Sequence, residues 1–417
     1  MVKSIYNLKD LYGGILMIII ELTESQFRNY SKMHSARNYF QTVEYAKMMK
    51  DTYKENYLGF INENDNTLMG ATLLLEKSIL KLKIGYIPGG FLVDYDNDNL
   101  FRDFVNTLKS YLKTKKYIYL CTDNLSTYKM FDKNGEVIYF DTNVLKIMEE
   151  VNFVRTGKSK LRKVVLETEK TPDETYKMFD SNTRRNINLS LQRAITIYKD
   201  ESNSMDTLTT LHTNSNFDSV KKILESFNTD NACAEIYFAK IEPEKYINNY
   251  RYLLKEEEDK NIELNRIMQD PTIKKSVSFI NKKMISDNLI TKYNNEIIKG
   301  TNLYTKYPEG IVLGSILIIK NNREIYFMHE GYNKELKTLY TSHLIKWEII
   351  KKYLNLGYKI FNFGLIKNMD KKNHDYLFKL GFGGKVYECV GTYDLVINKL
   401  LYYPIKLLYT ISNKLRK

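Results

Sequence analysis

The alternation of hydrophobic and polar positions between residues 17 and 123 predicts a series of short strands and helices. The segment "MIIIELTESQF", which begins at Met17, predicts a strand followed by a helix that a threonine caps. The polar turn "NENDNT" between two apolar runs predicts a hairpin. The expected helices span 24–34, 42–53 and 98–114, and the expected strands span 17–22, 56–62, 68–77, 81–91 and 117–123. These elements form an α/β unit in which helices flank an antiparallel meander.

The same order of helices, meander, helix and strand recurs after residue 161. Helices are expected at 172–179, 183–195, 204–212, 218–227 and 340–357, and strands at 162–168, 196–200, 235–241, 310–320, 324–332 and 358–364. Because a repeated order of elements indicates a duplicated fold, we expect two α/β domains of one kind. The first spans 17–160 and is completed by 388–417, and the second spans 161–387.

Residues 243–300 interrupt the second unit with a different pattern. Apolar residues recur there at helical spacing with charged residues between them, in two runs that "QDPT" at 269–272 separates. This pattern predicts an antiparallel helical arm, inserted in the second domain and making few contacts with the two cores. An ordinary pair of surface helices is the alternative.

The two ends of the chain carry patterns of their own. The strand that starts at Met17 favours an interpretation of residues 1–16 as a translated leader outside the fold. The aliphatic run at 15–20 is too short for a membrane span, which needs about 20 residues. The final stretch, 393–417, mixes apolar, aromatic and lysine residues. Packing on a domain is the favoured role for it, and a peripheral contact with an anionic membrane surface is the alternative.

The charge of the chain adds a polyanion to the expected partners. Its 417 residues include 63 Lys and Arg against 50 Asp and Glu, a formal net charge of +13. This balance favours nucleic acid, nucleotide phosphate or an anionic membrane face as a partner. The 34 tyrosines indicate an AT-rich genome, which explains the lysines equally well.

The positions of cysteine and histidine argue against a metal site. The three cysteines, Cys121, Cys233 and Cys389, lie far apart and form no CxxC pair, which favours a reducing cytosol. The five histidines, at 34, 212, 329, 343 and 374, form no pair with metal-ligand spacing. We therefore expect a cytoplasmic protein without a metal.

Six segments, in order along nearly the whole chain, carry a family resemblance. They are "YFQTVEYAK" (39–47), "GYIPGGF" (85–91), "TRRNINLSLQRAI" (183–195), "SHLIKWEII" (342–350), "GYKIFNFG" (357–364) and "YLFKLGFGGKVYECVGTYDLVINKLLYYP" (376–404). Together with the arm they resemble the Fem family (FemABX), and its long-armed members in particular. The resemblance implies two acetyltransferase-like (GNAT-type) domains in tandem. It also implies transfer of an amino acid from aminoacyl-tRNA to a peptidoglycan precursor.

The chain departs from the family pattern in three places. Leu365 stands where members commonly have a second glycine after "FNFG". The segment "PGGF" at 88–91 lacks the arginine that is usual there. The segment "HTNSNFD" at 212–218 replaces a threonine–arginine–phenylalanine pattern, so the family's precursor contacts in that region do not carry over directly.

Three glycines in four positions follow one lysine in "YLFKLGFGGK" (376–385), although the chain has only 19 glycines. Glycine is retained where the backbone needs a positive φ or a close approach, so the segment is either a structural turn or a pocket floor. Aminoacyl transfer needs a cation aimed at the tetrahedral oxyanion. We expect Phe378 and Lys379 to form this catalytic pair, with Gly381 and Gly383 letting the CCA end of the tRNA approach. The resemblance implies the same lysine, and a surface lysine beside a structural turn is the alternative.

Two residues of the first unit are candidates for binding the acceptor. Lys47, in "EYAK", matches a family lysine that contacts the precursor's uridine diphosphate or lipid pyrophosphate, and a compact ammonium suits that task. Asp123, at the end of "YIYLCTD", resembles a family aspartate near the acceptor, where a carboxylate orients or deprotonates the attacking ammonium. The alternatives are a solvated helix lysine and an aspartate that caps a helix over "NLSTYKMF".

Three arginines lie on the predicted helix 183–195. Arg185 and Arg193 are eight positions apart and share a face, beside Arg184. Such a face binds the phosphates of charged tRNA in a salt-dependent manner. A solvated basic face without a ligand is the alternative.

Two other functions remain open. An acyl-CoA-dependent N-acyltransferase holds pyrophosphate with a Gln/Arg-x-x-Gly-x-Gly/Ala loop that opens a helix, and the nearest candidate, "FKLGFGG", has Phe378 in place of the Gln or Arg. A non-catalytic RNA- or membrane-binding protein would use the charge and the arm but not Lys379. The favoured hypothesis is aminoacyl transfer. Its partners are charged tRNA and lipid II or UDP-MurNAc-pentapeptide, with aminoacyl-tRNA as the co-substrate and no cofactor.

Overall fold

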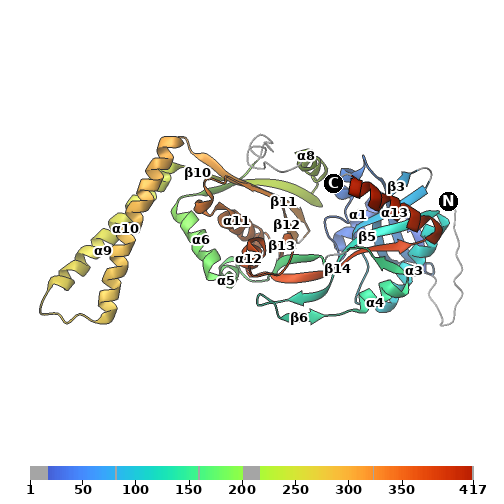
Figure 1. Cartoon of the computed structure of the whole chain (residues 1–417), viewed down its shortest axis with the longest axis horizontal. Helices are drawn as coiled ribbons and strands as arrows, with labels where there is room; N and C mark the ends of the chain where they lie inside the picture. Colours follow the sequence, from blue (N-terminus) through green and yellow to red (C-terminus); the bar gives the residue numbers. More distant parts are fainter. Residues whose placement is uncertain (1–16, 80–81, 158–159, 201–216, 323, 416–417) are drawn as a thin grey trace.

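The computed structural model describes residues 17–79, 82–157, 160–200, 217–322 and 324–415 (Figure 1). The predicted leader at 1–16 and the predicted helix at 204–212 lie outside the described residues, as does "HTNSNF" at 212–217 except for the backbone of its last residue.

The first half of the chain has the predicted order of helices and strands. Its elements are β1 (Met17–Glu21), α1 (Glu24–Met33), α2 (Val43–Met49), β2 (Lys54–Asn62), β3 (Leu68–Ile79), β4 (Leu82–Gly89), α3 (Asp98–Thr114), β5 (Tyr117–Phe131), β6 (Val137–Phe140), α4 (Asn143–Glu150) and β7 (Phe153–Arg155). Thr23 caps α1 in a capping box with Gln26, as the sequence predicts. The helix proposed after Asp123 is wrong, because β5 continues to Phe131 and forms a hairpin with β6.

The second half repeats this order around a longer insertion. Its elements are β8 (Arg162–Glu167), α5 (Pro172–Met178), α6 (Ser181–Gln192), β9 (Thr196–Lys199), α8 (Phe217–Ser226), β10 (Ala232–Ile241), α9 (Pro243–Gln269), α10 (Val277–Lys306), β11 (Ile311–Asn321), β12 (Glu324–Tyr332), the 3-10 turn η1 (Lys337–Leu339), α11 (Thr341–Asn355), β13 (Ile360–Ile366), α12 (His374–Leu380), β14 (Lys385–Val396) and α13 (Lys399–Leu415).

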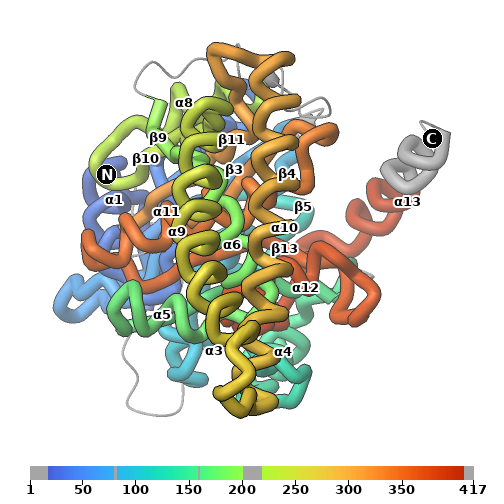
Figure 2. The backbone as a smooth tube through the Cα atoms, turned by 90° about the vertical axis from the view of Figure 1, so that its left-hand side faces the viewer, coloured from blue at the N-terminus to red at the C-terminus, as the bar shows by residue number. Residues whose placement is uncertain are grey.

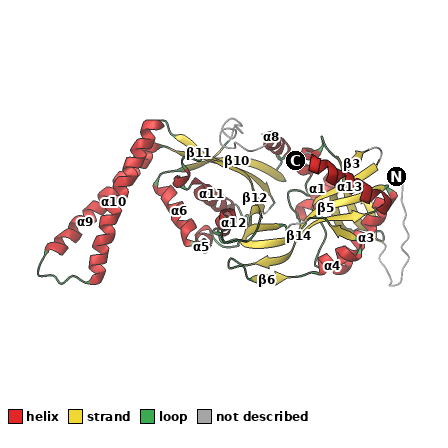
Figure 3. Ribbon diagram, viewed as in Figure 1, coloured by secondary structure: helices red, strands yellow, loops and turns green. Residues whose placement is uncertain are grey.

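One continuous sheet runs through both halves (Figure 3). The strand order is β1-β2-β3-β4-β5-β14-β8-β13-β12-β11-β10-β9. Each half has an antiparallel meander whose last strand pairs in parallel with the strand after the next helix, β4 with β5 and β12 with β13. This repeated topology is the tandem acetyltransferase-like α/β fold. The domain limits at 160 and 387 stay predictions, since β14 pairs with β8 through Lys385–Glu388 and with β5 through Val386–Val396.

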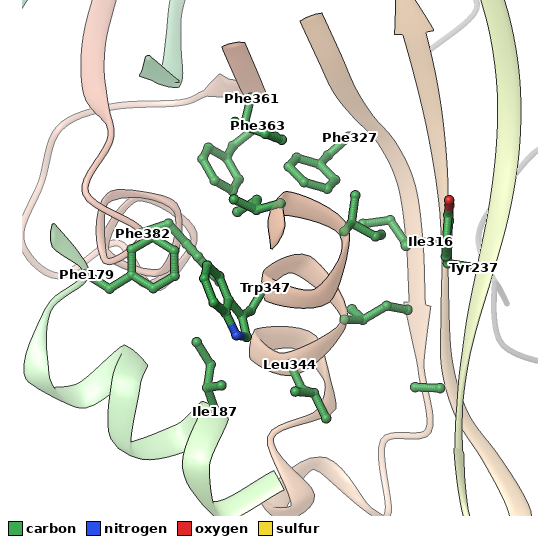
Figure 4. Close-up of a cluster of buried hydrophobic side chains, with 14 of the residues drawn as sticks. Phe179, Ile187, Tyr237, Ile316, Phe327, Leu344, Trp347, Phe361, Phe363 and Phe382 are labelled. Carbon is green, nitrogen blue, oxygen red and sulfur yellow. The ribbon is translucent and has the colours of Figure 1, made fainter. Parts of the chain in front are cut away.

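The core of the second half forms around α11. Its Leu344 and Trp347 belong to one buried cluster with Ile187 of α6 and Phe327 of β12 (Figure 4). Phe382, which follows α12, belongs to the same cluster and is completely buried. Burying one such side chain contributes about 1.5–3 kcal/mol, so the segment after α12 is anchored to a rigid core.

The two halves are also joined by packing on one face of the sheet. Phe27 of α1 and Val43 of α2 belong to one buried cluster with Ile236 and Phe238 of β10. The guanidinium of Arg37 donates to the backbone carbonyl of Asn231 (2.6 Å) at the same junction. The two halves are therefore joined by this buried cluster as well as by β14, which pairs with strands of both halves.

Helices α9 and α10 form an antiparallel arm that projects away from the sheet (Figures 1 and 2). The prediction of few core contacts is wrong for its base. Tyr246, Tyr250 and Tyr293 are buried in the core of the second half, and Glu296 accepts a hydrogen bond from the Tyr246 hydroxyl (2.6 Å). Aromatic side chains from both helices reach into the body, so only the outer part of the arm is an independent excursion.

The C-terminal helix α13 packs through one side and exposes another. Tyr402 is 5% exposed and donates to Asp394 (2.8 Å), whereas Leu400, Tyr403 and Leu407 are 88%, 62% and 62% exposed. Among the described helices, none combines the length and the hydrophobicity that crossing a bilayer requires.

Candidate functional site

The glycines after α12 accommodate the start of α6. A Cβ at Gly381 would lie 2.5 Å from the hydroxyl of Thr183, and one at Gly383, whose φ is +77°, would lie 3.1 Å from the carbonyl oxygen of Met178. Asp180 caps α6 and its amide donates to the carbonyl of Gly381 (2.9 Å). A side chain at either glycine would therefore meet atoms of this chain, while the expectation that these glycines let the CCA end approach stays a prediction.

A cavity of about 810 Å³ lies beside this glycine turn. The end of α5, the start of α6, the first turn of α11, helix α12 and the turn between β5 and β6 line it. The predicted residues that reach it are Phe378, Gly381, Gly383 and Arg184. The structure therefore brings the "FKLGFGG" segment and the basic helix to one hollow.

His343 and Asn186 form a polar part of the cavity wall that the sequence did not single out. The side-chain nitrogen Nδ2 of Asn186 lies 3.4 Å from Nε2 of His343, and the ring of Phe378 packs against the imidazole. Burial, together with the charge of Lys346, lowers the pKa of His343 to about 4, so the imidazole is neutral at pH 7. Nδ1 of His343 and Oδ1 of Asn186 are buried without a hydrogen-bond partner among the described residues. Because both atoms are shielded from solvent, a polar ligand would reach them only after neighbouring side chains move.

Lys379 follows Phe378 on α12, and its ammonium reaches the end of β13. The lysine is 9% exposed, and its ammonium donates to the carbonyl of Leu365 (2.9 Å) and pairs with Asp375 one turn earlier (3.1 Å). An ammonium has three N–H donors, so these two contacts leave one for a substrate. Lys379 is therefore a positioned cation within one residue of the cavity wall, but it does not itself line the cavity.

A second lysine is buried under the same phenylalanine. Lys346 of α11 is 1% exposed, pairs with Glu330 of β12, and lies 4.7 Å below the centre of the Phe378 ring. Burial lowers the pKa of Lys346, which the Glu330 carboxylate opposes. Burial alone would raise the pKa of Glu330, but Lys346 and the Tyr332 hydroxyl bring it below its usual value. This ion pair holds Phe378 from below, and the only sequence signal for it was the quoted segment "SHLIKWEII".

Asp123 and Lys47 lie in the first half. Asp123 stands opposite Pro88 and Thr392 in the sheet, and its carboxylate accepts hydrogen bonds from Tyr86 (3.0 Å) and Thr392 (2.6 Å). It is a strand residue, so the alternative of a helix cap is excluded. The Lys47 side chain is 51% exposed on α2 and pairs with Glu24 (3.3 Å). Exposed pairs of this kind are worth about 0–1 kcal/mol, so the ammonium is free to exchange partners.

The three arginines of the predicted basic face do not stay together. Arg184 and Arg185, on the first turns of α6, line a second hollow of about 370 Å³ together with Lys292 of the arm. Arg193 is 6% exposed; it pairs with Glu296 of α10 (2.9 Å) and donates to the carbonyl of Thr338 (2.8 Å). The expectation that Arg193 shares an exposed face with Arg185 is wrong, since the base of the arm covers it.

Replacing Arg193 should therefore act on stability. In Arg193→Met the Glu296 carboxylate loses its buried partner, and a break that leaves a buried charge uncompensated costs about 3–5 kcal/mol. Glu296 keeps Lys299 (2.7 Å), so we expect a loss near the lower end of that range. Arg185→Met, at an exposed position of the same helix, is the matched control and should change stability by less than about 0.5 kcal/mol. Urea unfolding of both variants measures the difference. Equal midpoints for the two variants would contradict a structural role of Arg193.

The cavity and its surroundings are suited to a ligand with an aromatic or planar part and anionic groups. Phe378 offers a ring face, His343 and Asn186 offer neutral hydrogen-bonding atoms, and Arg184 places a cation at the wall. Arginine binds phosphate through paired N–H groups, which gives this arrangement the chemistry of a nucleotide site.

Known proteins match this chain over nearly its whole length. A family model described as the FemAB family matches residues 22–410. Aminoacyltransferase FemA of Staphylococcus aureus strain bovine RF122 / ET3-1 is 23% identical over 435 residues, with 96% of this chain and 99% of the relative covered. The FemA of strain MRSA252 is 23% identical over 440 residues with the same coverage.

A solved structure has the same fold. The crystal structure of FemX superimposes with a TM-score of 0.70 at 20% sequence identity and covers 93% of this chain and 99% of that chain. The range matched by the family model includes both halves, the arm and the cavity. The chain therefore belongs to the FemAB family.

Proposed function

We propose that this chain is an aminoacyltransferase that builds the interpeptide bridge of peptidoglycan. It moves glycine, alanine or serine from aminoacyl-tRNA to the stem-peptide amine of lipid II or UDP-MurNAc-pentapeptide. One observation carries the proposal: in a FemAB family chain, Lys379 is held in place directly behind the wall of a cavity that suits a nucleotide. The FemA relatives are aminoacyltransferases. Aminoacyl-tRNA is a co-substrate in this reaction, which uses no cofactor.

The donor end of the tRNA would enter the cavity beside Phe378. Its phosphates would meet Arg184 and Arg185, whose positions at the start of α6 place two guanidinium groups near the opening. Neutral His343 and Asn186, which line the cavity, would form hydrogen bonds with the terminal nucleotide once a small side-chain movement exposes their unpaired atoms. Phosphate contacts of this kind make the affinity fall with salt.

Lys379 would act on the transferred acyl group. The stem-peptide amine attacks the ester carbonyl carbon, the carbonyl oxygen becomes an oxyanion, and the ester C–O bond then breaks. The amine's proton leaves with the ribose oxygen of the tRNA. The third N–H of the Lys379 ammonium would stabilise the oxyanion while Leu365 and Asp375 keep the other two in place.

The acceptor would be held from the first half. Lys47 would exchange its weak pair with Glu24 for the pyrophosphate of the precursor. Asp123 would orient the attacking ammonium, because a carboxylate that already accepts bonds from Tyr86 and Thr392 retains further lone pairs.

Lys47→Ala should weaken binding of the precursor about tenfold, because one charge-assisted hydrogen bond contributes about 1.5–3 kcal/mol and this one is partly exposed to water. Lys50→Ala, at the end of the same helix, is the matched control. Titration with nucleotide-linked precursor measures both affinities. An unchanged affinity in Lys47→Ala would show that Lys47 is a solvated surface lysine that does not contact the precursor.

The acyl-CoA alternative finds less support in the geometry. The glycines of "FKLGFGG" end α12 and lead into β14, whereas a pyrophosphate loop precedes a helix and points its amides at the ligand. The spaces beside Gly381 and Gly383 are filled by Thr183 and Met178. A coenzyme pyrophosphate has no cradle in this segment.

Incubation with charged tRNA and each precursor tests the proposal directly. Mass spectrometry should find a precursor heavier by one amino-acid residue, and the increment identifies the residue. Transfer from acetyl-CoA in the absence of tRNA would establish the acyl-CoA alternative instead. Absence of transfer with every donor, alongside retained RNA binding, would favour a non-catalytic binding protein.

A further inference from the structure

The free end of the arm carries an exposed aliphatic stripe. Val277, Ile280 and Met284 lie three and four positions apart on the first turns of α10 and are 75%, 45% and 56% exposed. Side chains at this spacing share one face of a helix. Ile273, in the loop between the helices, and Met268, in the last turn of α9, are 42% and 39% exposed. Exposed apolar groups gathered at one end of a molecule mark a contact site.

The same end is strongly basic. We define the arm tip as residues 266–284, which contain five basic residues and one acidic residue, a formal net charge of +4. Two of these basic residues pair with acidic residues just outside the range, Arg266 with Glu263 (3.0 Å) and Lys283 with Asp287 (2.5 Å), so a partner would be met mainly by the remaining three lysines. The basic residues are Arg266, Lys274, Lys275, Lys282 and Lys283, and the acidic residue is Asp270. The shaft of α9 has the opposite character, since "EEED" occupies 256–259. Positive charge is therefore concentrated at the tip and not spread along the arm.

The arm tip combines positive charge with exposed apolar side chains. This combination distinguishes among three kinds of partner: nucleic acid, a second copy of the chain and an anionic membrane. Nucleic acid lying along the arm would meet the acidic run at 256–259. The most exposed apolar side chains of the tip are aliphatic and offer bases no ring on which to stack, whereas Phe279 is only partly exposed. A second arm tip would bring two charges of +4 together. An anionic bilayer accepts both features, because its lipids attract lysine and its interface takes up aliphatic side chains.

We propose that the arm tip docks on an anionic membrane surface, with Val277, Ile280 and Met284 entering the interface and the surrounding lysines meeting lipid phosphates. The acidic run does not oppose this contact. Asp259 lies ten helical residues before Gln269, about 15 Å along the axis, which exceeds the Debye length of about 8 Å at physiological salt.

The contact would tether the catalytic body to the membrane. Helix α10 has 30 residues and is about 45 Å long, so a docked tip keeps the body within that distance of the lipid surface. This consequence rests on the proposed function, since it matters when the acceptor is lipid-linked. Confinement raises the effective concentration of such an acceptor without a new contact to it.

Binding to vesicles tests the tip without reference to catalysis. The full chain should sediment with vesicles that contain phosphatidylglycerol, and weakly with vesicles of phosphatidylcholine alone. Val277→Asp/Ile280→Asp should reduce binding at least tenfold, and Lys274→Gln/Lys282→Gln should reduce it in a manner that added salt mimics. Ile298→Asp, at a 57% exposed position near the base of the same helix, should bind like the unaltered chain.

Measurements on the same variant also distinguish the other possible partners of the arm tip. Failure of the unaltered chain to bind acidic vesicles, or equal binding by Val277→Asp/Ile280→Asp, would overturn the proposal. Loss of tRNA affinity in that variant with vesicle binding intact would make the tip a nucleic-acid contact. A change from dimer to monomer in sedimentation velocity, again with vesicle binding intact, would make it a self-association surface. Aminoacyl transfer to a nucleotide-linked acceptor should be unaffected by the variant, so a failed membrane contact and a failed catalytic proposal are distinguishable.

Discussion

Lys379→Met should lower the rate of aminoacyl transfer about 10²–10³-fold, the loss typical of removing one oxyanion donor. Because the interaction is made in the transition state, kcat should fall while the KM for charged tRNA changes little. The fold should survive: methionine keeps the length of the buried side chain, and the carbonyl of Leu365 loses one charge-assisted hydrogen bond, worth about 1.5–3 kcal/mol. Single-turnover transfer at saturating donor and acceptor measures the chemical step.

The matched control is Lys133→Met. Lys133 lines the same cavity from the turn between β5 and β6, so its removal changes the local charge by the same amount without touching β13. It should leave the single-turnover rate within a few-fold of the unaltered chain. Transfer by Lys379→Met at more than a tenth of the normal rate, or an equal loss in both variants, would contradict an oxyanion role for Lys379.

Elements with complete local signals were predictable from the sequence. Helix α3 has the predicted bounds, Asp98–Thr114, because Asn97 caps it and its apolar residues recur at helical spacing. The second half of β5 was not predictable, because only its last residues pair locally, with β6, whereas the pairing along its length is with β14, more than 250 residues later. Strand pairing at such a separation leaves no mark in the local sequence.

The same distinction separates the site residues. The concentration of glycines beside Lys379 was visible in the sequence, and the segment does lie at the cavity. The burial of Arg193 was not visible, because its partner Glu296 is 103 residues away on the arm. Lys346 and Glu330 likewise meet only when α11 packs on β12. Helical spacing alone therefore assigned Arg193 to a surface that the arm covers.

Replacing residues 246–298 with a short Gly/Ser linker should destroy the fold of the second half. The deletion removes Tyr246, Tyr250 and Tyr293, each of which is less than 10% exposed in the core. Losing one buried aromatic side chain costs about 3–5 kcal/mol. It also leaves Arg193 buried without Glu296, at a further cost of about 3–5 kcal/mol. Together these losses come to about 12–20 kcal/mol, which is at or above the upper part of the stability of about 5–15 kcal/mol that a domain typically has.

A shorter replacement, of residues 256–286, should leave the protein folded. It keeps the buried tyrosines and Glu296, together with Leu253, Leu254 and Leu289, which pack against the core. The residues removed are mostly exposed, and shortening such an excursion changes loop-closure entropy only slowly. Circular dichroism and thermal unfolding compare the two shortened proteins with the full chain. A folded 246–298 replacement would show that the base of the arm is dispensable, and an unfolded 256–286 replacement would show that the outer arm belongs to the core.

The folded short-arm protein also allows tRNA affinity to be measured against salt. A slope equal to that of the full chain would assign the phosphate contacts to Arg184 and Arg185, and a shallower slope would assign them to the outer arm.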